Sequence, residues 1–93
     1  MFRILVSTGV GVQLKKMKRV DSSSILRAIE THLRHEPERT SRSRIKRLRG
    51  VQTATYRLRV DEFRVFYDVS KGQVTVTAVL HKRDSAQFYQ GEK

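Results

Sequence analysis

Apolar and polar residues alternate most regularly in the C-terminal half of the chain. The alternation predicts three β-strands, at about residues 53–60, 63–69 and 73–80. Asp-Glu at 61–62 and Lys-Gly at 71–72 separate these strands, and we interpret each pair as a two-residue hairpin turn. The segment therefore predicts an antiparallel meander of three strands.

The beginning of the chain has the spacing of a strand followed by a helix. "FRILV" at 2–6 is typical of a strand. Residues 8–19 predict a weak helix, because Val10, Leu14 and Met17 share a face but two glycines interrupt it. A strand and a helix are therefore expected before the more regular segments.

A second and stronger helix is expected after residues 8–19, because Ile25, Ile29, His32 and Leu33 keep helical spacing. Asp21 and Ser22 are candidate N-caps, and Pro37 ends the helix at about Glu36 because a residue before proline avoids the helical region. A basic connection then leads into the three strands. The order β-α-α-β-β-β predicts an α+β domain with two N-terminal helices on one face of a twisted antiparallel sheet and a short C-terminal helix or tail.

The two turns fix which residues face each other across the meander. Arg59 is expected opposite Arg64, and Val65 opposite Ala78. One face then collects Tyr56, Leu58, Val60, Phe63, Val65, Tyr67, Val69, Val74, Val76, Ala78 and Leu80. The other face collects Arg57, Arg59, Arg64, Phe66, Asp68, Thr75, Thr77, Val79 and His81. The first face is expected to pack against the helices, and the second to be exposed.

Like charges directly opposite each other destabilise a pair of strands, so the expected pairing of Arg59 with Arg64 calls for an explanation. The arginines either extend into solvent and protect the sheet against aggregation, or bind phosphate. Guanidinium groups suit the second role because they bind phosphate oxygens in pairs and stay charged at any working pH.

The overall charge of the chain changes this picture, because 20 Lys and Arg against nine Asp and Glu give a net charge of +11. Such an excess favours nucleic acid or an acidic protein as partner. No acidic residue stands between Glu38 and Asp61. The basic residues of this stretch are either a solvated connection or RNA contacts, and the candidate contacts are Arg42, Arg44, Lys46, Arg47 and Arg49.

Length and composition exclude several classes of protein. A chain of 93 residues is expected to form one domain, residues 1–93. No apolar run reaches the roughly 18–20 residues of a membrane span, and the opening is too short for a signal peptide. Cysteine is absent, which leaves no disulfide or thiolate site. A soluble cytoplasmic protein without membrane contact is expected.

Four segments together resemble the RelE/ParE superfamily of toxins from type II toxin–antitoxin pairs. They are "RLRG" at 47–50, "YRLRV" at 56–60, "FRVFYDV" at 63–69 and "LHKRDSAQFY" at 80–89. The resemblance covers the C-terminal half well, whereas the first half agrees only in the order of its elements. It implies a RelE-like fold and an mRNA interferase, a metal-independent endoribonuclease without cofactor that cleaves mRNA in the ribosomal A site.

The resemblance also implies catalytic residues. The residues that match the RelE-type site are Arg57, Arg59, Arg64, Arg83 and Tyr89. Alternation had already placed the first three on one face. The prototype has lysines at the first two of these positions, and because arginine keeps its proton, neither can act as a general base here.

Cleavage through attack of the ribose 2′-OH needs a base, an acid and cations that hold the charge on phosphorus. The arginines fit the third task. His81 and Tyr89 are candidates for proton transfer, because histidine titrates near neutral pH and nearby arginines favour a phenolate. Tyr89 or Phe66 could instead stack on a splayed base, and Lys82 adds a candidate RNA contact. His32 and His35 have no third ligand at a suitable spacing, so no metal site is expected.

Other functions remain open from the sequence. The alternatives are a ParE-like inhibitor of DNA gyrase without nuclease activity, a non-catalytic RNA-binding protein, and a degenerate toxin that only binds its antitoxin. The resemblance implies a cognate antitoxin, the ribosome with its mRNA and rRNA, and a toxin–antitoxin hetero-oligomer as partners. An acidic antitoxin segment would associate quickly with a chain of this charge.

Overall fold

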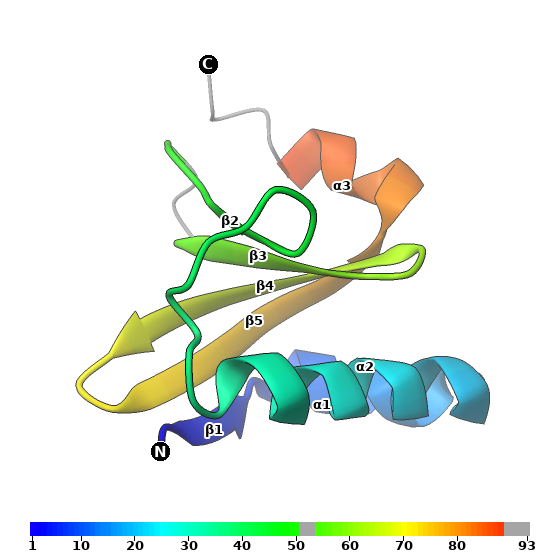
Figure 1. The fold of residues 1–93 in the computed structure, drawn as a ribbon. Helices are drawn as coiled ribbons and strands as arrows, with labels where there is room; N and C mark the ends of the chain where they lie inside the picture. Colours follow the sequence, from blue (N-terminus) through cyan, green and yellow to red (C-terminus); the bar gives the residue numbers. More distant parts are fainter. Residues whose placement is uncertain (51–53, 89–93) are drawn as a thin grey trace.

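A computed structural model describes residues 1–50 and 54–88, which form one sheet and three helices (Figure 1). The helices are α1 (Thr8–Lys16), α2 (Arg19–Leu33) and α3 (Lys82–Phe88). The strands are β1 (Arg3–Val6), β2 (Ile45–Arg47), β3 (Tyr56–Val60), β4 (Phe63–Ser70) and β5 (Gln73–His81). In the sheet the strands follow the order β1-β5-β4-β3-β2.

The predicted α+β fold class is confirmed. Helices α1 and α2 cover one side of the sheet, and α3 lies on the other side (Figure 1). Two details differ from the prediction. β1 pairs in parallel with β5, which makes the sheet mixed rather than antiparallel throughout. The basic connection contains a short edge strand, β2, which pairs with β3. No helix in the described ranges is both long and apolar enough to cross a membrane.

Both N-terminal helices are shorter at the C-terminal end than the sequence predicted. Ser7 caps α1 by accepting a hydrogen bond from the Val10 amide at 3.3 Å. The expected caps of α2 are wrong, because the helix begins at Arg19 and the amides of Asp21 and Ser22 both donate to the Lys18 carbonyl. α2 ends at Leu33, three residues before Glu36.

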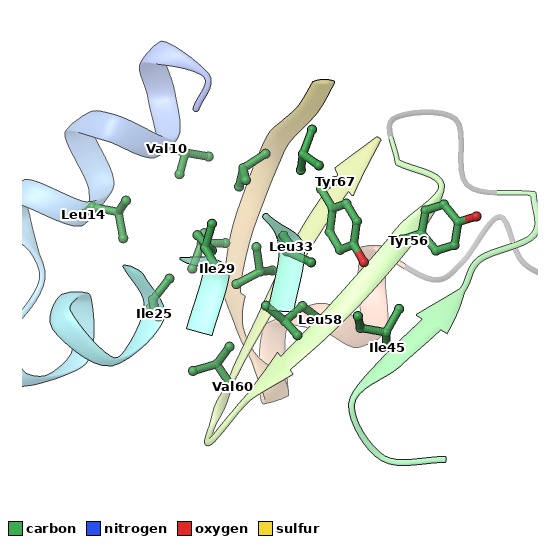
Figure 2. Packing of buried hydrophobic residues seen from close by; sticks show 14 residues of the cluster. Val10, Leu14, Ile25, Ile29, Leu33, Ile45, Tyr56, Leu58, Val60 and Tyr67 are labelled. Carbon is green, nitrogen blue, oxygen red and sulfur yellow. The ribbon is translucent and has the colours of Figure 1, made fainter. Parts of the chain in front are cut away.

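The main core lies between these helices and the sheet (Figure 2). α1 contributes Val10 and Leu14, which point toward the strands. The other buried members are Ile25, Ile29, Leu33, Ile45, Tyr56, Leu58, Val60, Val65, Tyr67, Val74, Val76 and Val79. The strand residues in this set show which face of the sheet is covered by the helices.

The first hairpin has the predicted register. Val60 pairs with Phe63 and Arg59 with Arg64, so residues 61–62 form the two-residue turn. Asp61 adopts a left-handed φ of 51°, a conformation that aspartate tolerates better than most residues. A tight turn therefore forms here without glycine.

The second hairpin keeps the predicted register only for its first half. Tyr67 pairs with Val76 as expected, but the next pair is Phe66 with Ala78. Thr77 is therefore an extra residue on β5, a β-bulge. All later pairs are shifted by one residue from the prediction.

The bulge reverses the predicted faces of the last residues of β5. Val79 lies in the main core, whereas it was predicted on the exposed face. Ala78 and Leu80 were predicted in that core, but they pack around Phe66 in a second, small cluster. One inserted residue is sufficient to move every later side chain to the other face, because strand side chains alternate with a period of two.

Candidate nucleic-acid interface

Arg57, Arg59 and Arg64 lie together on the side of the sheet that α1 and α2 do not cover, as predicted; we call this surface the arginine face. Their neighbours in β3, at positions 56, 58 and 60, are buried in the main core. Arg59 pairs directly with Arg64, and Arg57 pairs with Phe66. Pleating therefore brings the three guanidinium-bearing residues to adjacent positions.

The three arginines differ in their surroundings. Arg59 is exposed, whereas the other two are half-buried. Arg64 Nη1 donates to the carbonyls of Asp61 at 3.0 Å and Phe63 at 2.9 Å, which holds its side chain along the hairpin end. Arg57 Nε is buried and has no hydrogen-bond partner among the described residues. A buried N–H without a partner is costly, so a change of side-chain conformation that gave this donor an acceptor would stabilise it.

β2 adds a lysine to the arginine face. Lys46 pairs directly with Arg57. The backbone continues in the same register, since the Arg59 amide donates to the Arg44 carbonyl at 2.8 Å. Sequence reasoning included both Lys46 and Arg44 among the basic residues of the connection but missed this pairing, because three residues are too few for a recognisable alternation.

The other basic residues of the connection are more dispersed. Arg47 pairs with Tyr56, a core residue, so it lies on the opposite side of the sheet from Arg57. Arg42 and Arg49 are exposed outside the strands. Among the described residues, Lys46 is thus the member of this group that the register brings to the arginine face.

Phe66 is not available for base stacking, and its predicted exposed position is wrong. It lies on the arginine side of the sheet, but its side chain is 0% exposed. Leu48 and Ala54, together with Leu80, cover it. The bulge explains this burial, because it turns Leu80 toward Phe66.

His81 lies away from the arginine face, so its predicted position is also wrong. The bulge pairs it with Phe63, and the two rings meet edge to face with centroids 5.6 Å apart. Phe63 packs against the main core, on the helix side of the sheet. His81 Nδ1 accepts a hydrogen bond from the Arg83 amide at 3.3 Å, which orients the ring at the start of α3.

α3 carries Lys82 and Arg83 on the arginine side of the sheet (Figure 1). Both residues are exposed. Lys82 is linked to Glu62 in the hairpin turn in two ways, by an ion pair of 3.0 Å and by a hydrogen bond from its amide to the Glu62 carbonyl at 2.7 Å. The hydrogen bond from Lys82 holds the pKa of the Glu62 carboxyl below its usual value.

Tyr89, a predicted catalytic residue, lies outside the described residues.

Alternation places Asp68 on the arginine side of the sheet, two residues from Phe66 along β4. Its Oδ1 accepts a hydrogen bond of 2.6 Å from Thr55 Oγ1. It stands toward the opposite end of β4 from Arg64, four residues away. The repulsion between Arg59 and Arg64 is therefore not relieved by Asp68.

His32 and His35 both line a hollow at the C-terminal end of α2. Partial burial, and secondarily the nearby Arg44, lower the pKa of His32. In residues 1–50 and 54–88, histidine and acidic side chains form no group of three that could hold a metal ion.

Solved structures that are similar to this chain include two complexes. The first is the archaeal RelE–RelB complex from Pyrococcus horikoshii OT3, with a TM-score of 0.71, 19% identity, and coverage of 87% of this chain and 94% of that one. This chain has a RelE-like fold. The second is the RelB–RelE antitoxin–toxin complex from Methanococcus jannaschii, with a TM-score of 0.67, 20% identity, and coverage of 91% and 98%. No protein-family model and no curated protein matches the sequence.

Proposed function

We propose that this RelE-like protein is the toxin of a type II toxin–antitoxin pair and cleaves mRNA in the ribosomal A site. The observation that carries the proposal is the direct pairing of Arg59 with Arg64 on the side of the sheet away from α1 and α2. Arg57, beside them on the same side of the sheet, supports it. Adjacent guanidinium groups are typical of a site for an anion.

In the proposed reaction the ribose 2′-oxygen forms a bond to the adjacent phosphorus, and the bond from phosphorus to the 5′-oxygen breaks. The products are a 2′,3′-cyclic phosphate and a 5′-hydroxyl. A base takes the 2′-OH proton, and an acid gives a proton to the leaving oxygen. The reaction needs no redox partner and no cofactor.

The arginines would stabilise the charge that develops on the phosphoryl oxygens. Arg64 and Arg83 clamp the scissile phosphate, and Arg57 and Arg59 hold its oxygens and the adjoining backbone. Tyr89 remains the candidate for proton transfer. His81 is not assigned this role, because its ring packs against Phe63 on the helix side of the sheet.

The test compares Arg64→Ala with Arg47→Ala, which removes the same charge from the other side of the sheet. Loss of one stabilising donor is expected to slow cleavage by about 10²-fold or more. Growth arrest on induction and cleavage of mRNA on isolated ribosomes are measured for both variants. Undiminished cleavage by Arg64→Ala, or equal losses in both variants, would contradict the assignment.

The same induction separates the alternatives. Intact mRNA together with DNA damage would identify a gyrase inhibitor of the ParE type. Intact mRNA with strong binding to RNA would identify a non-catalytic RNA-binding protein. Neither result is compatible with an mRNA interferase.

We further propose an acidic antitoxin as partner. Both similar structures are complexes of RelE with RelB, and the net charge of +11 favours rapid association with an acidic segment. Co-expression with the neighbouring gene should give a stable heteromeric complex and abolish growth arrest. A toxin that purifies alone from such a co-expression would contradict this part of the proposal.

A further inference from the structure

Three hollows in the surface share Arg44 as a lining residue. One, of about 330 Å³, reaches Arg59 on the arginine face. A second, of about 270 Å³, lies between α2 and the end of β3. The third, of about 330 Å³, lies between the C-terminal end of α2 and the following connection. Arg44 therefore stands where the arginine face adjoins the hollows along α2.

α2 presents a polar stripe to these hollows. Its polar residues recur at intervals of three and four, the spacing of one helix face, and they are Ser24, Arg27, Thr31 and His32, with His35 two residues beyond the end of the helix. We call the surface lined by Arg27, Thr31, His32, His35, Arg39 and Arg44 the α2 groove. The buried stripe of the same helix contains Ile25, Ile29 and Leu33, so the core fixes which residues face the groove.

The charges of the α2 groove favour an anion. Arg27, Arg39 and Arg44 outnumber the two acids that line these hollows, Glu36 and Asp61. Glu36 is paired with Arg39 at 3.3 Å, but both side chains are largely exposed, and such a pair is worth only about 0–1 kcal/mol. A phosphate can therefore replace this carboxylate at little cost. Beside Arg59 the acids are Asp61 and Glu62, and Lys82 already binds the latter.

We propose that the α2 groove binds the sugar-phosphate backbone of the RNA that flanks the cleaved phosphate. The strand passes from Arg59 over Arg44 to the polar stripe of α2. This inference rests on the proposed nuclease function, because it assigns a path to the substrate of that site. The recognition is blind to sequence, since the groove offers cations and hydroxyls to phosphates.

The composition of the groove favours RNA over a protein partner. The centre of a protein interface needs apolar or aromatic anchors, whereas the apolar residues that line these hollows, Ala28, Ile45 and Val60, belong to the main core or pack against it. The exposed apolar residues of the two helices lie outside it, at Val12, Val20 and Leu26. A protein partner would therefore bind elsewhere on α1 and α2.

The experiment measures RNA binding by the full chain carrying Arg64→Ala, which is expected to prevent cleavage during the titration. The probes are single-stranded RNAs of about 4 and about 16 nucleotides, the range that single-strand-binding domains cover. The added substitutions are Arg27→Gln with Arg44→Gln. The matched control is Arg3→Gln with Lys71→Gln, which removes the same charge at and beside the opposite edge of the sheet.

The groove variant should bind the longer RNA at least tenfold more weakly and the shorter RNA almost unchanged. The slope of log K against log salt should become shallower by about 0.7 for each phosphate that the protein no longer neutralises. Equal effects of the groove and control pairs would overturn the proposal. Polyglutamate of matched charge serves as a second probe. The proposal would also be overturned if polyglutamate bound as tightly as the RNA and lost the same affinity in the groove variant.

The proposal of nuclease function and the proposal of RNA binding in the α2 groove can be contradicted by different results. If Arg64→Ala still cleaves mRNA while the groove pair selectively weakens the longer RNA, the groove stands and the catalytic assignment is wrong. If the groove pair has no effect while Arg64→Ala is inactive, the groove proposal is wrong and the RNA follows another path from the same site.

Discussion

Arg59 and Arg64 lie directly opposite each other across the β3–β4 pair, on the side of the sheet that α1 and α2 leave uncovered. Their neighbours Leu58 and Val65 are also paired, and both are fully buried in the core. The hydrophobic pairing therefore fixes the position of the charged pair. The sheet cannot separate the two arginines without exposing part of its core.

Arg59→Thr should stabilise the free protein by up to about 1 kcal/mol, because it removes like charges from opposed positions and introduces a good strand former. The same change should strongly reduce growth arrest, because Arg59 is proposed to hold the phosphate. Denaturant unfolding and induction assays measure the two effects. Arg3→Thr is the control, because Arg3 pairs with Gln73 rather than with a cation. A destabilised Arg59→Thr protein would contradict this account of the pairing.

Tyr67→Phe should lower the free energy of unfolding at neutral pH by about 1–2 kcal/mol. The buried hydroxyl donates to the Pro37 carbonyl at 2.6 Å, and the change leaves that carbonyl without its donor. Chemical denaturation at pH 7 measures the loss. Thr75→Val, at a half-exposed strand position, provides a comparison in which no buried carbonyl loses its partner.

The same tyrosine predicts an alkaline limit to stability. Burial, and secondarily the neighbouring Tyr56, raise the pKa of Tyr67 above its usual value. A raised pKa in the folded state contributes stability below the unfolded value of about 10, and this contribution is lost as the pH rises further. Between pH 9 and 11 wild type should therefore lose more stability than Tyr67→Phe. Parallel curves for the two proteins would show that the phenol does not control this loss.

His32 predicts a limit on the acid side. Its lowered pKa means that folding favours the neutral ring, so its contribution is present above the unfolded pKa of about 6.5 and is lost as the pH falls. Between pH 7 and pH 5 the melting temperature of His32→Gln should fall less than that of wild type. Thermal unfolding at a series of pH values measures this difference. An equally steep decline in both proteins would assign acid sensitivity to other groups.

Deletion of Thr77 tests the β-bulge. Because Phe66 already pairs with Ala78, removing the extra residue should keep every later pair and most of the stability. Deletion of Thr75, in the regular part of the strand, should instead turn a buried valine outward, at a cost of about 1.5–3 kcal/mol for each one expelled. Thermal unfolding of both deletion variants measures the contrast. Similar losses in the two would contradict the bulged register.

Much of the sheet could be predicted because its two turns are short. A two-residue turn leaves one register, and the apolar positions of β3 and β4 then share a face; this placed Arg57, Arg59 and Arg64 correctly. The β-bulge could not be predicted in this way. The sequence from Val74 to Leu80 is apolar enough to satisfy either face, so the pattern does not reveal which residue is extra.

The pairing partners of the two edge strands also depend on packing rather than on local sequence. β1 pairs with a strand about 70 residues later in the chain, which no local periodicity encodes. β2 is only three residues long and is formed because Ile45 enters the core beside Leu58. Lys46 consequently faces Arg57, a neighbour that composition alone could not assign.

The double attachment of Lys82 to Glu62 has a mechanical consequence. Arg64 follows Glu62 by two residues, and Arg83 follows Lys82 by one. The joint between the turn and α3 therefore limits how far the anchoring points of these two cations can drift apart in the empty protein. If Arg64 and Arg83 hold the phosphate as proposed, this restraint means that less conformational entropy would be lost when a phosphodiester binds between them.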